Sequence, residues 1–290
     1  MTMNGDMTIS AALERAEEQM TIVNLAENTR KAYRLELRRF FDNVGKVPSE
    51  VVAADLRGWV LGRIESGLTP GSVNMTAAAL RFLFRDALDR PDLVKGLRNQ
   101  RTPRKLPRHM SVEEIERLTL AVTDIRYRTA ITLSYGAGLR ISETVGVKVS
   151  HIIADRNLLH IPSGKGGTER MAPLPANLVG HLRGYWRNIY PRPVSWMFYA
   201  RSPEQPISTD SLRNAFNAAR DRVGVSRTYT FHCLRHSFAA HVHERGGSID
   251  VIQDALGHRQ SDTTRGYARA TGRMFASLDH PLSGSPVLAA

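Results

Sequence analysis

Several residues with useful chemistry gather near the C-terminus, between Thr230 and Tyr267. His232 and Arg235 are three residues apart in a stretch with helical periodicity, which brings an imidazole and a guanidinium onto one helix face. His258 follows, and Tyr267 comes nine residues after it. Guanidiniums bind phosphate through paired hydrogen bonds, histidines exchange protons near neutral pH, and a tyrosine oxygen can act as a nucleophile. These residue types together suit the transfer of a phosphoryl group.

Two further blocks lie upstream and complete a recognisable pattern. Residues 138–143 read GLRISE, and residues 164–167 read GKGG. Together with His-Cys-Leu-Arg at 232–235, Leu-Gly-His at 256–258 and Tyr267, they resemble the signature of the tyrosine recombinase and phage-type integrase family, in particular its simple, Xer-like two-domain members. A single His-x-x-Arg is weak evidence, but five blocks in this order and spacing argue against coincidence.

The resemblance implies an enzyme that breaks and rejoins DNA. Tyr267 would attack a backbone phosphate and form a 3′-phosphotyrosine, which retains the energy of the broken bond, so rejoining needs no cofactor. Lys165 would protonate the leaving 5′ oxygen, and Glu143 would orient its neighbours. Arginines would clamp the phosphate, and histidines would donate hydrogen bonds or shuttle protons to it. The implied catalytic residues are Arg140, Lys165, His232, Arg235, His258 and Tyr267.

Each of these residues also has an ordinary structural explanation. Lys165 could be a solvated turn residue, and Arg140 could form a surface ion pair. A metal site is disfavoured because the histidines around His236 have no accompanying acid and no His-Glu-x-x-His motif. Cys233 has no separate base and is better explained as a buried thiol. A DNA-binding regulator that never cuts is the remaining alternative, but it gives no reason for Lys165 and Tyr267 to coexist with the histidines.

The elements that must position these residues are mostly helical. Between residues 9 and 97 apolar residues such as Leu37 and Phe40 recur at helical spacing, and Asn28 and Thr29 are expected to cap one helix. The segment resembles the family's core-binding domain. The predicted fold is therefore mainly α, with an all-helical N-terminal domain and a mostly helical catalytic domain that contains a small antiparallel β-sheet, the DNA breaking-rejoining enzyme fold.

The catalytic domain is expected over residues 109–275. Residues 111–114 have the spacing of a capping box that opens its first helix. Short apolar runs separated by two turns predict the antiparallel sheet over 150–175, and helical periodicity returns over 210–223. The tail at 276–290 contains prolines and a glycine rather than the pattern of a long docking helix.

The chain is basic enough to indicate a polyanionic partner. Its 290 residues include 40 Lys and Arg against 28 Asp and Glu, a formal net charge of +12. The run 98–108 contains five basic residues, two prolines and no acid, which predicts an extended linker along DNA phosphates. Arg30, Arg34 and Arg38 fall four residues apart and form a basic stripe on one face of an N-terminal helix. This stripe is a second candidate for contact with DNA, although a solvated charged face explains it equally well. The predicted DNA-binding residues are Arg30, Arg34, Arg38, Arg101, Arg104, Lys105, Arg213 and Arg220.

The predicted partners follow from the family. The first partner is double-stranded DNA with inverted half-sites. The second is three further copies of the chain, which complete a homotetramer that exchanges DNA strands through a Holliday junction. A second recombinase or an accessory protein is a further possible partner. The sequence shows neither a membrane-spanning apolar run nor an export signal, so a cytoplasmic protein is expected, without a metal or other cofactor. Integration or excision, dimer resolution and transposition all stay open as biological roles.

Overall fold

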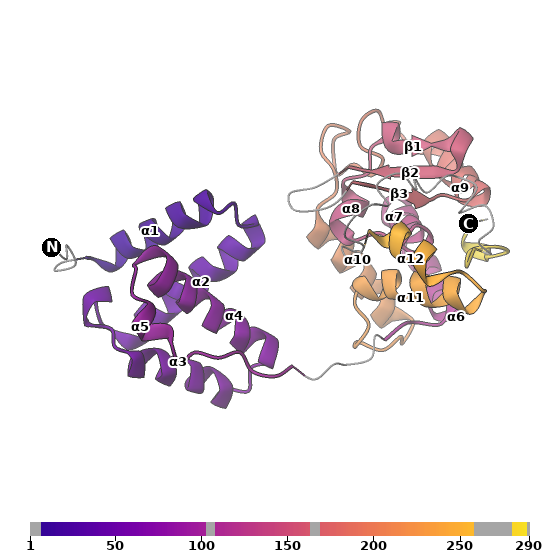
Figure 1. The fold of residues 1–290 in the computed structure, drawn as a ribbon. Coiled ribbons are helices and arrows are strands. Elements are labelled where there is room, and N and C mark those ends of the chain that lie inside the picture. Colours follow the sequence, from indigo (N-terminus) through magenta and orange to yellow (C-terminus); the bar gives the residue numbers. More distant parts are fainter. Residues whose placement is uncertain (1–6, 103–107, 163–168, 258–279, 289–290) are drawn as a thin grey trace. The chain divides into compact units, whose positions relative to one another are not determined.

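The structure is a computed structural model that describes residues 7–102, 108–162, 169–257 and 280–288. The chain divides into two compact units, Met1–Lys105 and Leu106–Ala290, and the division falls within the basic run 98–108 (Figure 1). Helices dominate both units, and the second contains a three-stranded antiparallel sheet. The predicted fold class is confirmed.

All regular elements that the structure describes in the first unit are helical. They are α1 (Ile9–Ile22), α2 (Glu27–Val44), η1 (Pro48–Glu50), α3 (Ala53–Glu65), α4 (Pro70–Arg81), the π-helical turn η2 (Phe82–Ala87) and α5 (Pro91–Val94). Their apolar faces enclose a core in which the Phe40 ring meets the rings of Phe41 and Phe84 edge to face.

The start of α2 differs from the expectation. The helix begins at Glu27 with Ala26 as the N-cap, and no side chain caps it. A left-handed residue, Asn24, turns the chain just after α1, so α2 starts before the polar pair Asn28 and Thr29. The prediction that these two residues cap the helix is wrong, because both lie inside its first turn.

A buried carboxylate ties three helices of the first unit together. Glu36 of α2 is only 1% exposed and accepts hydrogen bonds from Trp59 Nε1 and Arg63 Nη2 of α3 and from Thr76 Oγ1 of α4. A buried charge costs free energy unless hydrogen bonds and an opposite charge satisfy it, and here both are present. Glu36 therefore has a structural explanation.

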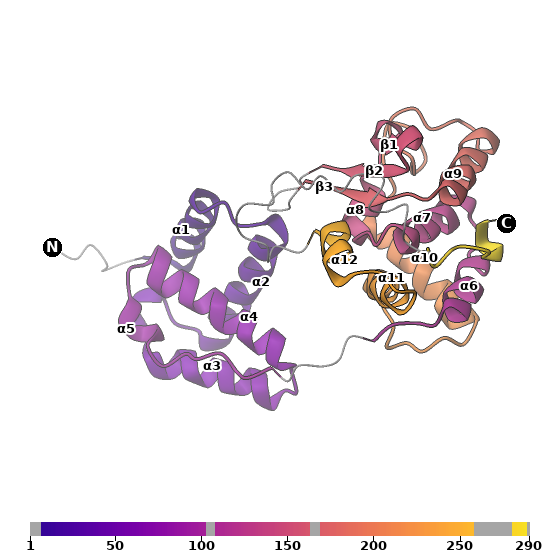
Figure 2. The same ribbon diagram turned by 45° about the vertical axis from the view of Figure 1, so that its right-hand side comes forward.

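The second unit is organised around one central helix, α7. Its elements before the sheet are α6 (Val112–Leu120), α7 (Ile125–Gly136), α8 (Ile141–Val145) and η3 (Val149–His151). After the sheet come α9 (Ala176–Asn188), α10 (Thr209–Arg222), α11 (His232–Glu244), α12 (Ile249–Leu256) and η5 (Pro286–Leu288). Every residue from 129 to 136 of α7 is buried, and the helix lies between α9 and α11 (Figures 1 and 2).

The sheet has the predicted antiparallel form. It consists of β1 (Ile152–Ile153), β2 (Leu158–Ile161) and β3 (Arg170–Pro173) in that order. Leu159 pairs with Ile152 on one side and with Ala172 on the other. The turn between β1 and β2 contains η4 (Ala154–Arg156) and Asn157 in the left-handed region, where asparagine is tolerated. The second predicted turn, at 164–167, lies outside the described residues.

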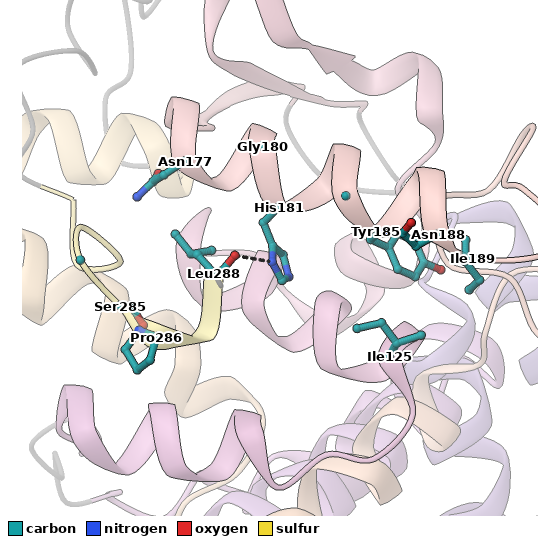
Figure 3. A pocket seen from close by; sticks show the side chains of 12 residues that line it. Ile125, Asn177, Gly180, His181, Tyr185, Asn188, Ile189, Ser285, Pro286 and Leu288 are labelled. Atoms are coloured by element: carbon teal, nitrogen blue, oxygen red, sulfur yellow. Dashed lines mark hydrogen bonds between the residues drawn. The ribbon is translucent and has the colours of Figure 1, made fainter. Parts of the chain in front are cut away.

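The last described segment, 280–288, packs onto the second unit. His280 is 5% exposed, and its Nε2 donates to the oxygen of Gly136 at the end of α7. His181 Nδ1 of α9 donates to the Leu288 oxygen at 3.3 Å, beside a pocket that α9 and this segment line together (Figure 3). The described segment that follows the predicted nucleophile, Tyr267, therefore packs on the same unit that carries the predicted catalytic arginines, Arg140 and Arg235.

Candidate active site

A glycine turn delivers Arg140 to the surface of the second unit. After α7 ends at Gly136, Gly138 adopts φ +60°, and a Cβ atom there would lie 2.7 Å from side-chain carbons of Phe238 and Leu256. The chain then places Arg140 at the N-cap of α8, with its side chain 44% exposed. The block Gly-Leu-Arg thus combines a position that only glycine fits with an accessible guanidinium.

Glu143 lies at the centre of the charged groups. Its Oε1 accepts from Arg140 Nη1 at 2.7 Å, and its Oε2 accepts from the Arg140 backbone N–H and from Arg170 Nη2, both at 2.8 Å. Burial would raise the pKa of Glu143, but the charge of Arg170 and the hydrogen bonds from Arg140 outweigh it, so the pKa lies below its ordinary value. The carboxylate stays ionised and holds the guanidiniums around it.

Arg235 joins this cluster from α11. It is 3% exposed, and Nη1 donates to the Gly138 oxygen at 2.8 Å while Nη2 donates to the Leu256 oxygen. Burial, with the charges of Arg140 and Arg170, lowers its pKa to about 10, so it remains charged at neutral pH. Three guanidiniums thus share one carboxylate, which leaves an excess of two positive charges that would attract an anion.

His232 begins α11 one turn before Arg235. The residue as a whole is exposed, yet the ring of His236 partly shields its imidazole ring, and the two ring centroids are 4.6 Å apart. This burial, with the charges of His236, Arg235 and Arg140, lowers the pKa of His232. The imidazole is therefore neutral at pH 7 and can donate one hydrogen bond and accept another.

The structure brings together three predicted catalytic residues: Arg140 and Arg235 lie around Glu143, and His232 lies close enough to both arginines for their charges to lower its pKa. Five predicted site residues lie outside the described residues: Arg104, Lys105, Lys165, His258 and Tyr267. The catalytic and DNA-binding roles assigned to all of these residues stay predictions.

The predicted basic stripe on α2 is partly engaged within its own unit. Arg30 Nε donates to Glu17 Oε1 and Arg34 Nη2 donates to Glu17 Oε2, each at 2.8 Å. The hydrogen bond from Arg30, aided by Arg34, lowers the pKa of Glu17 even though burial opposes it. Arg38, one turn further along, is exposed. Sequence spacing did not identify Glu17, because it comes from α1.

The other predicted DNA contacts differ in exposure. Arg101 is exposed, and Arg213 of α10 is about half exposed beside Asp210, with which it forms an ion pair. Arg220 is only 8% exposed, donates from Nη1 to the Tyr229 oxygen at 2.8 Å and pairs with the neighbouring Asp221. Its guanidinium closes the connection between α10 and α11, an intramolecular role that helical periodicity alone does not indicate.

Arg170 is the residue near the site that the sequence analysis missed. It opens β3, is 8% exposed and donates to both Glu143 and the Ala255 oxygen. The signal that could have found it is a cation at the start of an apolar strand, three residues after the GKGG block, because an unpaired charge is rarely buried.

Two other chemistries find little support among the described residues. Nowhere in those ranges do three His, Cys, Asp or Glu side chains gather as a metal site would require. Cys233 is buried, and its sulfur accepts a hydrogen bond from the Thr230 N–H at 3.4 Å.

None of the described helices combines the length and apolar character needed to cross a bilayer.

Comparison with known proteins gives the class to which this fold and site belong. Residues 108–273 match the phage integrase family, and residues 12–92 match the N-terminal SAM-like domain of phage integrases. The chain therefore belongs to the phage integrase family and is a tyrosine recombinase, an enzyme of site-specific DNA recombination.

Individual relatives extend over nearly the whole chain. A Sinorhizobium fredii protein, y4qK, whose name describes it as an integrase/recombinase, is 35% identical over 291 residues, covering 97% of this chain and 94% of its own. The tyrosine recombinase XerA of Pyrococcus furiosus is 30% identical over 268 residues, or 91% of each chain. A solved structure of lambda integrase residues 75–356, a dimer on a core site, shares the fold with a TM-score of 0.73 at 20% identity, covering 89% of this chain and 97% of that one.

Proposed function

We propose that this recombinase cuts and rejoins DNA at specific sites through a 3′-phosphotyrosine on Tyr267 and a Holliday junction. The observation that carries the proposal is the pairing of Arg140 and Arg235 with Glu143, in a cluster with an excess of positive charge, with His232 beside both arginines. Transfer of a phosphodiester requires that charge on the equatorial oxygens be stabilised, and fixed guanidiniums provide this without reorganisation.

The proposed cleavage step balances as an exchange of esters. The Tyr267 oxygen attacks the scissile phosphorus in line, the P–O5′ bond breaks, and the 3′ phosphate becomes esterified to the tyrosine. Lys165 gives its proton to the departing 5′ oxygen, while His232 or His258 accepts the proton of the tyrosine hydroxyl. Attack by a 5′ hydroxyl of the partner strand reverses these steps, so neither water nor ATP is consumed.

The proposed assembly is a homotetramer on two DNA sites, each with inverted half-sites. Two pairs of strand exchanges would convert them through a Holliday junction. A lambda integrase tetramer bound to a Holliday junction has been solved, and this chain shares its fold with a TM-score of 0.72. We propose a cytoplasmic enzyme of integration or excision, dimer resolution or transposition, working alone or with a second recombinase.

The proposed division of labour assigns residues 9–97 to core binding, 98–108 to a linker along the backbone, 109–275 to catalysis and 276–290 to a tail. Among the described candidates, Arg38, Arg101 and Arg213 are exposed and suit DNA contacts best. Arg30, Arg34 and Arg220 would mainly stabilise the local structure, because each donates hydrogen bonds within its own unit, to Glu17 or to the Tyr229 oxygen. Arg104 and Lys105 complete the proposed contacts in the linker.

The direct test is a covalent trap. The full chain is incubated with a nicked suicide substrate built from inverted repeats flanking its gene, and SDS-resistant adducts are measured. Wild type should form an adduct, Tyr267→Phe should form none, and Tyr190→Phe, which alters a 93% exposed tyrosine of the same unit, should match wild type. An adduct with Tyr267→Phe would contradict the nucleophile. Tight, site-specific binding by wild type without any adduct would instead favour the non-cutting regulator.

A further inference from the structure

Arg170 connects three segments of the second unit through one buried side chain. Its backbone opens β3 opposite Ile161 of β2, five residues after Lys165. Its Nη2 donates to Glu143 Oε2 at 2.8 Å, and its Nη1 donates to the oxygen of Ala255 in the last turn of α12. The residue therefore links the start of β3 both to the carboxylate that holds the arginine cluster and to the last turn of α12.

The contact with α12 is tight. A Cβ atom on Gly257 would lie 2.6 Å from Arg170 Cδ and 3.2 Å from its Nε, so the helix end rests directly on the arginine side chain. The last carbonyls of a helix lack partners within the helix and favour a cation. Arg170 and Arg235 bind two successive ones, those of Ala255 and Leu256.

Stability alone does not explain a guanidinium at this position. Burial lowers the pKa of Arg170, although Glu143 opposes the shift, and its Nε is buried without a hydrogen-bond partner in the part of the chain that the structure describes. Arg170 also lowers the pKa of Arg235 by charge repulsion. A well-packed apolar side chain would avoid this desolvation, so the arginine has another use.

That use follows from the sharing of Glu143 Oε2. Arg170 Nη2 occupies this oxygen at 2.8 Å, while Arg235 Nη1 lies 3.8 Å from it, beyond hydrogen-bond distance. Without Arg170, the largely buried Oε2 atom of Glu143 would lose a hydrogen bond. Arg235 is the cation best placed to donate a replacement hydrogen bond to this oxygen. Such a movement would draw Arg235 away from the Gly138 oxygen and disturb the cluster that contains Arg140.

We propose that Arg170 is a positioning residue for the phosphate clamp: through Glu143 and the end of α12 it fixes the guanidiniums of Arg140 and Arg235 for transition-state stabilisation. The proposal deepens the proposed function and rests on it. Arg170 itself does not contact the phosphate, because its Nη atoms are engaged with Glu143 and Ala255.

A change in the substrate separates this role from a general structural one. A methylphosphonate at the scissile position replaces a non-bridging oxygen with a methyl group and removes its negative charge. The guanidiniums then have much less charge to stabilise, whereas the nucleophile and the leaving group still have to be aligned. A defect in the phosphate clamp should therefore shrink on this substrate, and a defect in folding or in the alignment of Tyr267 should not.

Adduct formation by the full chain is measured in single turnover on both substrates. Arg170→Met should slow cleavage of the phosphodiester about 10- to 100-fold and cleavage of the methylphosphonate less than about 3-fold. Arg140→Ala serves as the positive control with the same pattern. Arg126→Met is the matched control, because Arg126 also binds a carboxylate, of Asp124, and a carbonyl, of Ala200, at the far end of α7. It should cleave both substrates at nearly the wild-type rate.

A conservative variant keeps the test decisive if Arg170→Met folds poorly in thermal unfolding, and a double variant adds a second check if it folds well. Arg170→Lys retains the charge, but one ammonium cannot reproduce the planar fork that spans Glu143 and Ala255, so it should show the same substrate pattern more weakly. Adding Arg170→Met to Glu143→Gln should slow cleavage little beyond Glu143→Gln alone, because both act through one contact.

Equal slowing of both substrates by a folded Arg170→Lys would overturn the positioning role, and so would fully additive effects in the double variant. Failure of the proposed function is recognised separately, because it would appear as adduct formation by Tyr267→Phe or as no adduct with wild type. Arg170 is tested only on a wild-type background that cleaves through Tyr267.

Discussion

The guanidinium of Arg235 is hydrogen-bonded at 2.8 Å to the main-chain oxygen of Gly138, although 97 residues separate them in the sequence. The bond fixes the first turn of α11 against the turn that precedes Arg140. The two predicted members of the phosphate clamp are therefore positioned by one shared backbone feature. Their geometry depends on a glycine in the left-handed region as much as on the arginines themselves.

Substitution of that glycine should damage the frame. Gly138→Ala would strain a backbone with φ +60° and drive a methyl group to 2.7 Å from Phe238 and Leu256, so we expect a loss of about 1–3 kcal/mol in the free energy of unfolding. Denaturant melts of the full chain measure it. Gly180→Ala is the matched control, because this glycine of α9 has open space around it and alanine favours helix. Equal stability of Gly138→Ala and wild type would contradict the strain argument.

The proposed acid can be tested by changing the leaving group. Lys165→Ala should slow cleavage of a phosphodiester about 100-fold or more while leaving DNA affinity nearly unchanged, because the 5′ oxygen would depart without a proton. A substrate with sulfur in place of that oxygen should restore the rate, since a thiolate leaves without protonation. Lys148→Ala, which removes a lysine stacked on Trp196 in the same unit, is the control. No recovery with the sulfur substrate would argue against a general acid.

The sequence predicted what depends on local patterns. The capping box of Ser111 and Glu114 has the expected form, and so does the first of the two turns expected between the apolar runs of the sheet, because short-range hydrogen bonds and backbone preferences determine both. The existence of two helical regions around a small sheet follows from apolar periodicity in the same way.

What the sequence did not predict depends on partners from distant segments. Glu17 occupies Arg30 and Arg34 from another helix, and Arg170 reaches Glu143 and Ala255 across the unit. A spacing rule identifies which residues share a face but not what that face meets. The central helix α7 is buried on all sides over residues 129–136. Its sequence therefore has little amphipathic pattern from which its packing partners could be predicted.

Acid should destabilise the second unit. Burial lowers the pKa values of His232, His236 and His241, so near pH 6 these groups bind protons more readily in the unfolded chain than in the folded one. Stability is then fully present above the ordinary histidine pKa of about 6.5 and is lost as the pH falls toward the lowered folded values. Urea unfolding of the full chain between pH 7.5 and 5 should show this decline.

One buried pair allows the pH effect to be assigned. Burial raises the pKa of Tyr135, which stays protonated and donates to His241 Nδ1 at 2.7 Å. Tyr135→Phe should cost about 1 kcal/mol through loss of this bond but retain the pH dependence, because the buried imidazole remains. His241→Gln should make the decline between pH 7.5 and 5 shallower. An unchanged slope in His241→Gln would show that His241 does not contribute to the acid sensitivity.

Arg213 and Arg220 lie on the same helix and should respond differently to substitution. Arg213 is about half exposed beside Asp210, so Arg213→Ala should weaken DNA binding, lower the slope of log affinity against log salt by about 1, and leave the melting temperature nearly unchanged. Arg220 is 8% exposed and bonded to the Tyr229 oxygen, so Arg220→Met should lower stability by about 1–3 kcal/mol. Salt titrations of DNA binding and thermal melts of both variants separate the two effects. Wild-type affinity and salt slope in Arg213→Ala would remove α10 from the proposed DNA interface, because Arg213 is its exposed predicted contact.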